Sequence, residues 1–430
     1  MTTTKHIYKV FKKHPSISTD SRKIEKGCIF FALKGETFNG NKFAESAIKQ
    51  GASYAIIDEK EYQVSDKMIL VDNVLKSLQE LANHHRKQLA TPVLAITGTN
   101  GKTTTKELTS AVLSQKFNVS FTEGNLNNHI GVPLTLLKMN TSTEFGVVEM
   151  GANHPGEIAE LCKIAEPDFG LITNVGKAHL EGFGSFEGVI QTKSEMYRHL
   201  KKSNGHIFYN ADNPILSDLL KDTKNKISYG TLNADLRGEL LNSPPFVHLK
   251  VNFPKGVLYL NTNLTGDYNF ENILAAACIG NYFQVDPIAI QSAIKNYFPK
   301  NNRSQLIKKD HLKIIMDAYN ANPTSMQASI NSFISNASEN SYLILGDMLE
   351  LGKYSNAEHT AILEILRKNT FVNVFTVGKI FNKISAGFNC KSFQNVNELY
   401  DYLQSNPIEK GKILIKGSRG IQLEKLLDLF

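Results

Sequence analysis

The chain has 430 residues, and its 48 lysines and arginines outnumber its 41 aspartates and glutamates, giving a net charge of +7 with histidine neutral. This length predicts about three domains, and 41% hydrophobic with 21% charged residues excludes a disordered, collagen-like or coiled-coil protein. The sequence contains neither a signal-like start nor about 18 uninterrupted apolar residues, so we expect a soluble chain without membrane insertion. The four cysteines are widely spaced and form no zinc or disulfide pattern, which favours the reducing cytoplasm.

Short apolar runs alternate with amphipathic stretches along most of the chain. This is the pattern of parallel strands connected by helices, so the predicted fold class is α/β. In the first predicted domain, residues 1–90, we expect strands at 28–33, 54–58 and 68–71 and helices at 43–52 and 77–89. The Thr91-Pro92 pair then interrupts the pattern.

Two further domains are predicted after this break. In residues 91–300 we expect strands at 93–97, 145–150, 169–173 and 206–210, helices from about 102, after 158 and at 269–283, and an antiparallel addition at 225–265. A polar, proline-marked segment at 299–304 is a candidate linker. In residues 301–430 we expect strands at 312–320, 341–348, 372–378 and 411–417.

A glycine-rich loop, GTNGKTTTKE (98–107), follows the strand at 93–97 and opens a helix. Gly98 and Gly101 allow a tight turn, Lys102 can reach phosphate oxygens, and backbone N–H groups at a helix start favour an anion. The loop matches only G-x-x-G-K-T. The full phosphate-loop pattern, G-x-x-x-x-G-K-[ST], requires a glycine at the position of Ile96. We predict a site for ATP or another nucleotide, and the alternative is a glycine-rich turn capped by threonine.

Three more side chains are candidates for metal chemistry. Glu149 ends a predicted strand, where a carboxylate points into the ligand crevice and can hold Mg²⁺; the alternative is a surface or helix-start glutamate. His179 lies in a glycine-rich loop after the next strand, and a structural histidine is its alternative because Mg²⁺ prefers oxygen ligands. Lys193 lies on a predicted helix, where the alternative is a solvated lysine.

Taken together, the motifs resemble the Mur ligase family of ATP-dependent amide-bond ligases. They occur in the family's order along nearly the whole chain: GTNGKTTTKE, GNLNNHIGVP, VVEMGANHPGEI, NVGKAHLEGFGS, KSE, NADNP, GDYNFENILAA, DAYNANPTSM, LGDMLELG and KGSRG. The resemblance implies a three-domain architecture with a first domain that binds a UDP-sugar peptide, a central phosphate-loop ATPase domain and a Rossmann-like C-terminal domain.

Within the family, DAYNANPTSM (317–326) and LGDMLELG (345–352) are similar to the branch that joins D-alanyl-D-alanine to UDP-N-acetylmuramoyl-tripeptide. The segments STDSR (18–22) and FALKGETFNGNKF (31–43) resemble the family's uridine-nucleotide recognition segment. Asn39-Gly40-Asn41 departs from the DGH-like triplet of the relatives, which puts the contacts to the nucleotide in doubt there. The resemblance therefore implies these two substrates, with ATP and Mg²⁺ as cofactors.

The resemblance also assigns roles to single positions. It implies that Lys102 and the 98–103 backbone hold phosphates, that Thr103 and Glu149 bind one Mg²⁺, and that His179 binds a second. Lys193 matches a lysine that some relatives carry as a carbamate, and an unmodified lysine is the alternative. Lys102, His179 and Lys193 are thus the implied catalytic residues. The implied nucleotide contacts are Gly98, Thr99, Asn100, Gly101, Lys102, Thr103, Thr104, Asn272 at the adenine, Arg303, and Asp317 at the ribose or hinge. The implied substrate contacts are Ser21, Arg22, Asn127, Asn128, Asn320, Asn322 and Asp347.

Other functions stay open at this point. A relative could add a different amino acid to a UDP-muramoyl peptide, or glutamate to a folate, and a phosphate-loop switch protein would use the same nucleotide loop. Nucleic-acid binding rests only on the positive charge, because no basic run with interleaved aromatic residues occurs. We expect a monomer with no nucleic-acid partner.

Overall fold

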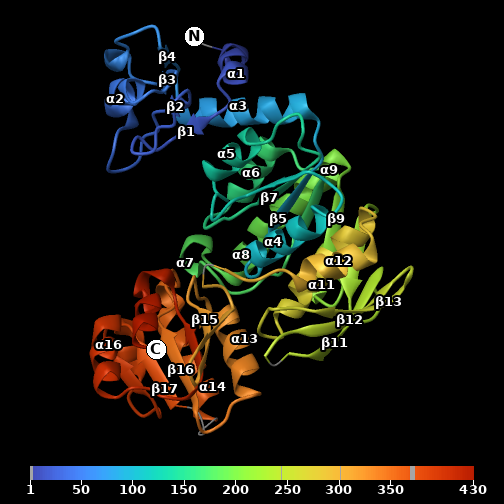
Figure 1. Ribbon diagram of the computed structural model, residues 1–430, viewed down its shortest axis with the longest axis vertical. Helices are drawn as coiled ribbons and strands as arrows, with labels where there is room; N and C mark the ends of the chain where they lie inside the picture. The colour runs from blue at the N-terminus through green and yellow to red at the C-terminus, as the bar shows by residue number, and fades with distance from the viewer. Residues whose placement is uncertain (1–2, 244, 301, 369–372) are drawn as a thin grey trace.

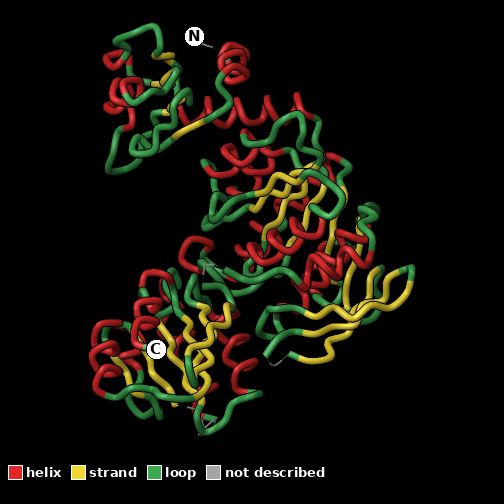
Figure 2. Tube along the Cα trace, viewed as in Figure 1, coloured by secondary structure: helices red, strands yellow, loops and turns green. Residues whose placement is uncertain are grey.

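The computed structural model describes residues 3–243, 245–300, 302–368 and 373–430. Small parts of four predicted segments, namely residues 1–2, Pro244, Asn301 and Val372, lie outside the described residues. Three sheets follow one another along the longest axis of the molecule, with the N-terminal sheet at one end and the C-terminal sheet at the other (Figure 1). Helices and strands alternate in each of them (Figure 2), which confirms the predicted α/β class.

The N-terminal sheet has four parallel strands in the order β1-β2-β3-β4. The elements of this region are α1 (Thr4–Lys13), β1 (Ile17–Ser18), β2 (Ile29–Phe31), α2 (Ala44–Lys49), β3 (Tyr54–Ile57), β4 (Met68–Leu70) and α3 (Val74–Leu89). Helix α1 was not predicted from the sequence. It forms because Ile7 and Phe11, four residues apart, share one buried face while its lysines stay exposed.

Helix α3 connects this region to the central domain, across whose end it lies in Figure 1. It packs on α1 from one side and on α5 (Gly131–Leu137) and α6 (Glu157–Ala165) from the other. The buried Arg86 side chain donates to Asp168 Oδ2 at 2.7 Å and to the carbonyl oxygens of Ala165 and Glu166, each at 3.2 Å. His85 Nε2 hydrogen-bonds the Met139 carbonyl oxygen at 2.8 Å. The last helix before the predicted boundary at residue 90 is therefore held by the central domain.

The central sheet has nine strands in the order β13-β12-β11-β10-β9-β8-β5-β7-β6. Its strands are β5 (Val93–Thr97), β6 (Val119–Phe121), β7 (Phe145–Glu149), β8 (Phe169–Ile172), β9 (His206–Asn210), β10 (Lys226–Gly230), β11 (Leu236–Asn242), β12 (His248–Phe253) and β13 (Gly256–Asn261). Besides α5 and α6, its helices are α4 (Lys102–Leu113), α7 (Leu180–Phe183), α8 (Phe186–Lys193), α9 (Glu195–Ser203), α10 (Pro214–Leu219), α11 (Asn269–Tyr282) and α12 (Pro287–Lys295).

The prediction of an antiparallel addition at 225–265 is correct only in part. Strands β11, β12 and β13 do pair antiparallel. Strand β10, however, pairs parallel with β9, and its last residues pair parallel with the start of β11. The reason is that α10 lies between β9 and β10, so the chain completes one more strand-helix-strand unit before the hairpins begin.

The order of the central strands creates a crevice at the start of α4. Strand β5 lies between β7 and β8, both parallel to it, so the loops that leave the carboxyl ends of these three strands diverge at this position. Ligands of open α/β sheets bind where neighbouring connections diverge in this way. The glycine-rich loop after β5 and Glu149 at the end of β7 both face this position.

The C-terminal sheet has six strands in the order β14-β15-β19-β16-β17-β18, all parallel except β14. Its elements are β14 (Gln305–Lys309), β15 (Leu312–Asp317), α13 (Pro323–Ile334), β16 (Ser341–Gly346), α14 (Ser355–Arg367), β17 (Asn373–Val377), α15 (Lys379–Ile384), β18 (Lys391–Phe393), α16 (Val396–Ser405) and β19 (Gly411–Lys416). The predicted linker leads directly into β14, which forms a hairpin with β15. No described helix is long and apolar enough to cross a membrane.

The attachment of α3 yields a prediction about stability. Replacing Arg86 by alanine removes a donor from two carbonyl oxygens and from the half-exposed carboxylate of Asp168, whose Oδ2 still accepts from the Val93 amide at 2.8 Å. We expect a loss of about 1–3 kcal/mol in the free energy of unfolding, measured by urea titration with circular dichroism.

The matched control is Lys87→Ala on the same helix. The Lys87 ammonium lies 2.8 Å from Glu166 Oε1, but both side chains are about half exposed, so this change should cost less than about 1 kcal/mol. Equal losses in the two variants would contradict the anchoring role of Arg86.

Candidate functional site

A cavity of about 800 Å³ lies between the central and C-terminal domains. Its walls contain the phosphate loop, the ends of β7 and β15, and the first turn of α13. Most of the residues singled out in the sequence line it: Thr99, Asn100, Gly101, Lys102, Thr103, Thr104, Asn127, Asn128, Glu149, His179, Asn272, Arg303, Asp317, Asn320 and Asn322. Five do not line it: Ser21, Arg22, Gly98, Lys193 and Asp347.

Both glycines of the phosphate loop are required by close packing. A Cβ atom at Gly98 would lie 2.0 Å from Thr173 Oγ1, and one at Gly101 would lie 2.3 Å from Asn272 Oδ1. Both residues also have positive φ angles, +141° and +78°, that favour glycine. The loop is therefore pressed between the segment after β8 and helix α11, and this packing fixes the start of α4 in the cavity wall.

The half-buried Lys102 ammonium lies within this loop and donates to the carbonyl oxygens of Gly98 and Thr99, at 2.8 and 2.9 Å. Burial lowers its pKa to about 8; the carboxylate of Glu149 opposes this shift, and the positive charge of Arg303 adds to it. A phosphate group next to the ammonium would compensate its desolvation. The geometry thus favours an anion at the start of α4.

Glu149 presents one carboxylate oxygen that has no protein partner. Its side chain is 1% exposed. Oε1 accepts a hydrogen bond from Asn127 Nδ2 at 2.7 Å, and the buried Oε2 has no hydrogen-bond partner among the residues that the structure describes. An unpaired buried carboxylate oxygen is costly unless a cation or donor reaches it. Mg²⁺ is bound through one or two carboxylates together with phosphate oxygens, so the free oxygen of Glu149 is a candidate ligand beside the phosphate loop. The described residues contain no cluster of three or more His, Cys, Asp or Glu side chains.

His179 has a partner from the other domain. It precedes α7 in the left-handed conformation, and its Nδ1 contacts Glu350 Oε2 in the C-terminal domain. This contact lowers the pKa of the Glu350 carboxyl. Neighbouring contacts join the same segments: the Lys177 amide donates to Thr324 Oγ1 at 2.9 Å, and the Tyr354 hydroxyl donates to the Gly184 carbonyl oxygen at 3.1 Å. The predicted role of His179 as a second Mg²⁺ ligand stays a prediction.

Lys193 is buried at the end of α8 rather than solvated. Its side chain is 2% exposed, and its Nζ lies 5.4 Å from the centre of the Phe183 ring. Burial, reinforced by the charge of Lys102, lowers the pKa of Lys193 to about 7. A substantial fraction of this amine is therefore neutral at neutral pH. A neutral amine is the form that reacts with carbon dioxide to give a carbamate.

Two predicted ligand-contacting asparagines support the local structure. Asn272 Oδ1 accepts from the Thr105 hydroxyl at 3.0 Å, and its amide donates to Asn269 Oδ1 at 2.8 Å, which joins α4 to α11 beneath the loop. Asn128 Oδ1 accepts from the amides of Ile130 and Gly131, at 3.1 and 2.9 Å, where α5 begins. Their ligand roles at the adenine and the substrate stay predictions.

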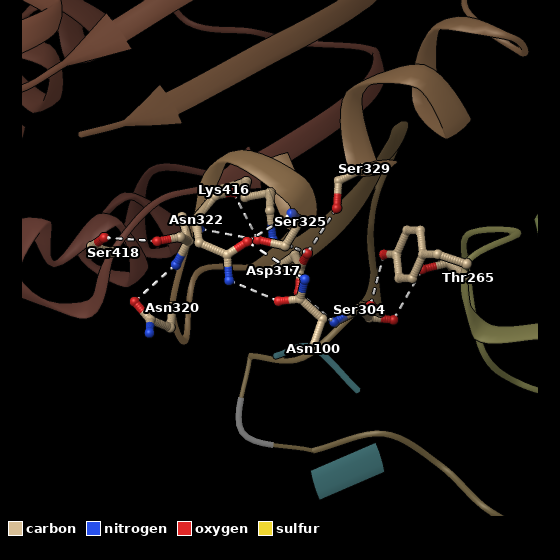
Figure 3. Close-up of polar contacts among 12 residues, drawn as sticks. Asn100, Thr265, Ser304, Asp317, Asn320, Asn322, Ser325, Ser329, Lys416 and Ser418 are labelled. Atoms are coloured by element: carbon tan, nitrogen blue, oxygen red, sulfur yellow. Dashed lines mark hydrogen bonds and ion pairs between the residues drawn. The ribbon is translucent and has the colours of Figure 1, made fainter. Parts of the chain in front are cut away.

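Asp317 lies at the end of β15 within a polar network, shown in Figure 3. Its Oδ2 accepts from Lys416 at 2.6 Å and from Ser329 at 3.0 Å, while Oδ1 accepts from the Ser304 amide at 3.2 Å. The Ser304 carbonyl oxygen accepts from Thr265 Oγ1 of the central domain at 3.0 Å. Asp317 therefore connects the segment that enters the C-terminal domain with the sheet of that domain, and its role at the ribose or hinge stays a prediction.

Arg303 precedes this network and reaches the cavity. Its guanidinium lies 3.6 Å from the centre of the Tyr319 ring, a cation–π contact that holds the positive group against the C-terminal wall. Neither the hinge contacts of Asp317 nor the stacking on Tyr319 is visible in a sequence motif. Both depend on segments that only the folded chain brings together.

The phosphate loop contacts the C-terminal domain directly through two asparagines. Asn322 Nδ2 donates to Asn100 Oδ1 at 2.8 Å (Figure 3). Asn322 is also the N-cap of α13, where its Oδ1 accepts from the Ser325 amide. Asn320 folds back so that its Oδ1 accepts from the Ala321 amide at 2.9 Å. Asn322 was predicted as a dipeptide contact, and the structure gives it a position between the two domains.

Three predicted substrate residues lie away from the cavity. Asp347 is 3% exposed, and its two oxygens accept from the amides of Ile380 and Phe381 at 2.9 Å, so it caps α15. Its predicted dipeptide role stays a prediction. Arg22 forms two hydrogen bonds to Asp20, at 2.9 and 2.8 Å, on the exposed surface of the N-terminal domain. Ser21 lies next to it, and this pair stays a prediction.

The Asn39-Gly40-Asn41 triplet has a structural explanation. Asn41 is fully buried, donates to Asp58 Oδ1 at 2.9 Å and accepts from the Asp58 amide at 3.0 Å. Asn39 donates to Glu59 Oε2 at 2.9 Å. A Cβ atom at Gly40 would lie 2.3 Å from the Leu33 carbonyl oxygen. The triplet thus holds the end of β3, and its last side chain has no surface for a ligand.

Several residues of the site were not identified from the sequence. Lys416 lies in KGSRG and Glu350 in LGDMLELG, two motifs that were noticed but whose roles at these positions were not assigned. Asn174 also belongs to a noted motif, and its Oδ1 accepts from the Asn100 amide at 2.9 Å. The sequence signal that could have identified such residues is a charged or amide side chain at or just after the end of a predicted parallel strand.

Three family models match the chain in order: "Mur ligase family, catalytic domain" at residues 15–86, "Mur ligase middle domain" at 96–280 and "Mur ligase, glutamate ligase domain" at 302–419. A UDP-N-acetylmuramoyl-tripeptide–D-alanyl-D-alanine ligase of Bacillus subtilis is 36% identical over 96% of this chain and 92% of its own length. The crystal structure of MurF from Acinetobacter baumannii has a TM-score of 0.88 at 30% identity, covering 96% of this chain and 92% of that one. MurF from Thermotoga maritima in complex with ADP has a TM-score of 0.85 at 28% identity, covering 96% of both chains. The chain belongs to the Mur ligase family.

Proposed function

We propose that this chain is an ATP-dependent ligase that joins D-alanyl-D-alanine to UDP-N-acetylmuramoyl-tripeptide, the last cytoplasmic step of muramoyl-pentapeptide synthesis for peptidoglycan. The observation that carries the proposal is full-length similarity to enzymes named for this reaction. The cavity between the central and C-terminal domains supports it, because a phosphate loop there faces a second domain. The N-terminal domain would hold the UDP end of the first substrate, with Ser21 and Arg22 as candidate contacts.

The reaction needs activation because a carboxylate is a poor electrophile. An oxygen of the tripeptide's terminal carboxylate attacks the γ-phosphorus of ATP, and ADP leaves. The neutral amine of D-alanyl-D-alanine then attacks the acyl carbon of this acyl phosphate, phosphate leaves, and the amine nitrogen loses a proton as the amide forms. Phosphoryl transfer of this kind depends mainly on positioning and charge neutralisation.

The chain supplies these two requirements at the start of α4. Lys102 and the backbone amides of residues 98–103 would hold the phosphates, and Arg303 would add positive charge from the C-terminal side. The free Oε2 of Glu149 and the Thr103 hydroxyl would hold Mg²⁺, with His179 at a second ion. When bound, Mg²⁺ neutralises phosphate charge. Asn127 keeps the Glu149 carboxylate oriented through its bond to Oε1.

The C-terminal domain would present the dipeptide to the same cavity. Asn320 and Asn322 line its wall, and the bond from Asn322 to Asn100 joins this wall to the phosphate loop. Asp317 accepts from Lys416 and from the Ser304 amide within the C-terminal domain, and the Ser304 carbonyl oxygen accepts from Thr265 of the central domain. Approach of the amine to the acyl phosphate would therefore depend on the arrangement of the two domains.

The first test is substrate dependence. We expect phosphate release from ATP with Mg²⁺ only when UDP-N-acetylmuramoyl-tripeptide and D-alanyl-D-alanine are both present, with a pentapeptide product by mass spectrometry. Omitting each substrate in turn provides the control. Release that is indifferent to both substrates would contradict the proposal and favour a nucleotide switch, and release with another amino acid would favour another ligase of the family.

A second prediction concerns the phosphate loop. Lys102→Ala should lower turnover on the order of 10² to 10³-fold or more, because the charge beside the transferred phosphoryl group is lost. Lys163→Ala is the matched control, since this exposed lysine lies on the surface of α6. Steady-state phosphate release measures both variants, and near-normal turnover of Lys102→Ala would contradict the assignment.

A third prediction concerns Lys193. With a pKa of about 7, its amine is mostly protonated at pH 6 and mostly neutral at pH 8. At fixed dissolved carbon dioxide, carbamate formation should therefore increase with pH across this interval. Carbon-13 NMR of the protein equilibrated with labelled carbon dioxide measures it, and Lys193→Met should abolish the signal. A signal that persists in this variant would assign the carbamate to another amine.

A further inference from the structure

A second cavity, of about 210 Å³, lies between the two domains and outside the site described above. One wall is the face of the C-terminal sheet formed by β14, β15 and β19, and α13 covers it; Figure 1 shows α13 beside β15. The segment from Thr265 to Tyr268 of the central domain closes one side. No step of the proposed reaction uses this cavity.

The sheet face in the cavity carries an apolar row. Leu306 of β14 pairs with Ile315 of β15, and Ile315 pairs with Leu414 of β19, so the three side chains lie side by side. Phe333 of α13 faces them across the cavity. An apolar cavity of about 150 Å³ can hold a benzene molecule, so this cavity has room for one ring and a short arm.

A row of lysines lies two residues along the same strands. Lys308 pairs with Lys313, and Lys313 pairs with Lys412, so these three exposed lysines are cross-strand neighbours on the face that carries the apolar row. Lys313 and Lys412 line the cavity, and Lys412 Nζ donates to the Asn336 carbonyl oxygen at 3.1 Å. In the described part of the chain none of the three lysines forms an ion pair, and no acidic side chain lines the cavity. Like charges directly opposite one another destabilise a sheet, and an anion between them would relieve the repulsion.

We propose that this cavity binds a small carboxylate with an aryl-sized apolar body. The ring lies on the apolar row beneath Phe333, and the carboxylate lies between Lys313 and Lys412. Residues two apart in a strand are separated by about 7 Å, a distance that a short arm and a flexible lysine span. The size of the cavity and the positive charges of Lys313 and Lys412, which form no ion pair in the described part of the chain, favour this class over a neutral or cationic ligand.

An occupant of the cavity would act on the wall that it shares with the nucleotide site. Tyr268 and Ser329 line both cavities. The Tyr268 hydroxyl hydrogen-bonds Ser304 Oγ at 2.8 Å, and Ser329 donates to Asp317 at 3.0 Å. A ligand against these two side chains therefore contacts the residues that hold the hinge. It would lower turnover without occupying the position of ATP.

The test uses 3-phenylpropionate as the probe and 3-phenylpropan-1-ol as its uncharged counterpart. Isothermal titration of the full chain without substrates should give saturable binding of the carboxylate and about tenfold weaker binding of the alcohol, because charge-assisted hydrogen bonds are the stronger ones. ATP should not displace the carboxylate. No saturable binding, equal binding of the two probes, or displacement by ATP would each overturn the proposal.

Variants assign the binding to this cavity. Lys313→Met with Lys412→Met should weaken carboxylate binding about tenfold and leave alcohol binding unchanged. Lys379→Met, an exposed position on α15 outside the cavity, is the matched control. Leu306→Trp fills the cavity from the edge strand and should abolish binding of both probes, while circular dichroism checks its fold. Unchanged carboxylate binding in the double methionine variant, or in a folded Leu306→Trp variant, would overturn the proposal.

Discussion

The close packing around the glycine-rich loop is the constraint on which the site depends. Thr173 and Asn272 leave no room for a side chain at Gly98 or Gly101, so the loop can only turn sharply into α4. This turn holds the half-buried Lys102 ammonium against the carbonyl oxygens of Gly98 and Thr99 and places the first turn of α4 in the cavity wall. The desolvated charge lowers the pKa of Lys102 and makes the position favourable for an anion.

The same loop connects the central domain to the C-terminal domain. Asn100 of the loop accepts a hydrogen bond from Asn322 of the C-terminal domain. Nearby, His179 contacts Glu350 and Lys177 donates to Glu358 of the same domain. The phosphate loop is therefore in direct contact with the C-terminal wall of the cavity. Apolar contacts contribute as well, because Ala321, Met348 and Leu351 of the C-terminal domain belong to the same buried cluster as Val175, Leu180 and Phe183 of the central domain.

Burial gives two charged residues properties that their sequence neighbours do not indicate. Lys193 lies on a helix where a solvated lysine was an equal interpretation, yet packing against Phe183 removes it from water and lowers its pKa to about 7. Glu149 keeps one oxygen for Asn127 and one without a partner. In both cases the chemistry follows from desolvation, which depends on the neighbours in space.

The sequence by itself determined the α/β class, the strands next to the site and the loop chemistry, because apolar periodicity and glycine spacing are local properties. The order of the family's motifs also predicted that Lys102, Glu149 and Arg303 belong to one nucleotide site, and all three line the same cavity. Only the tertiary structure decided that Asp347 caps α15, that Asn41 is buried against Asp58 and that β10 is parallel. These outcomes depend on contacts between segments far apart in the chain. A local sequence pattern does not indicate which distant group will form a hydrogen bond with a given side chain.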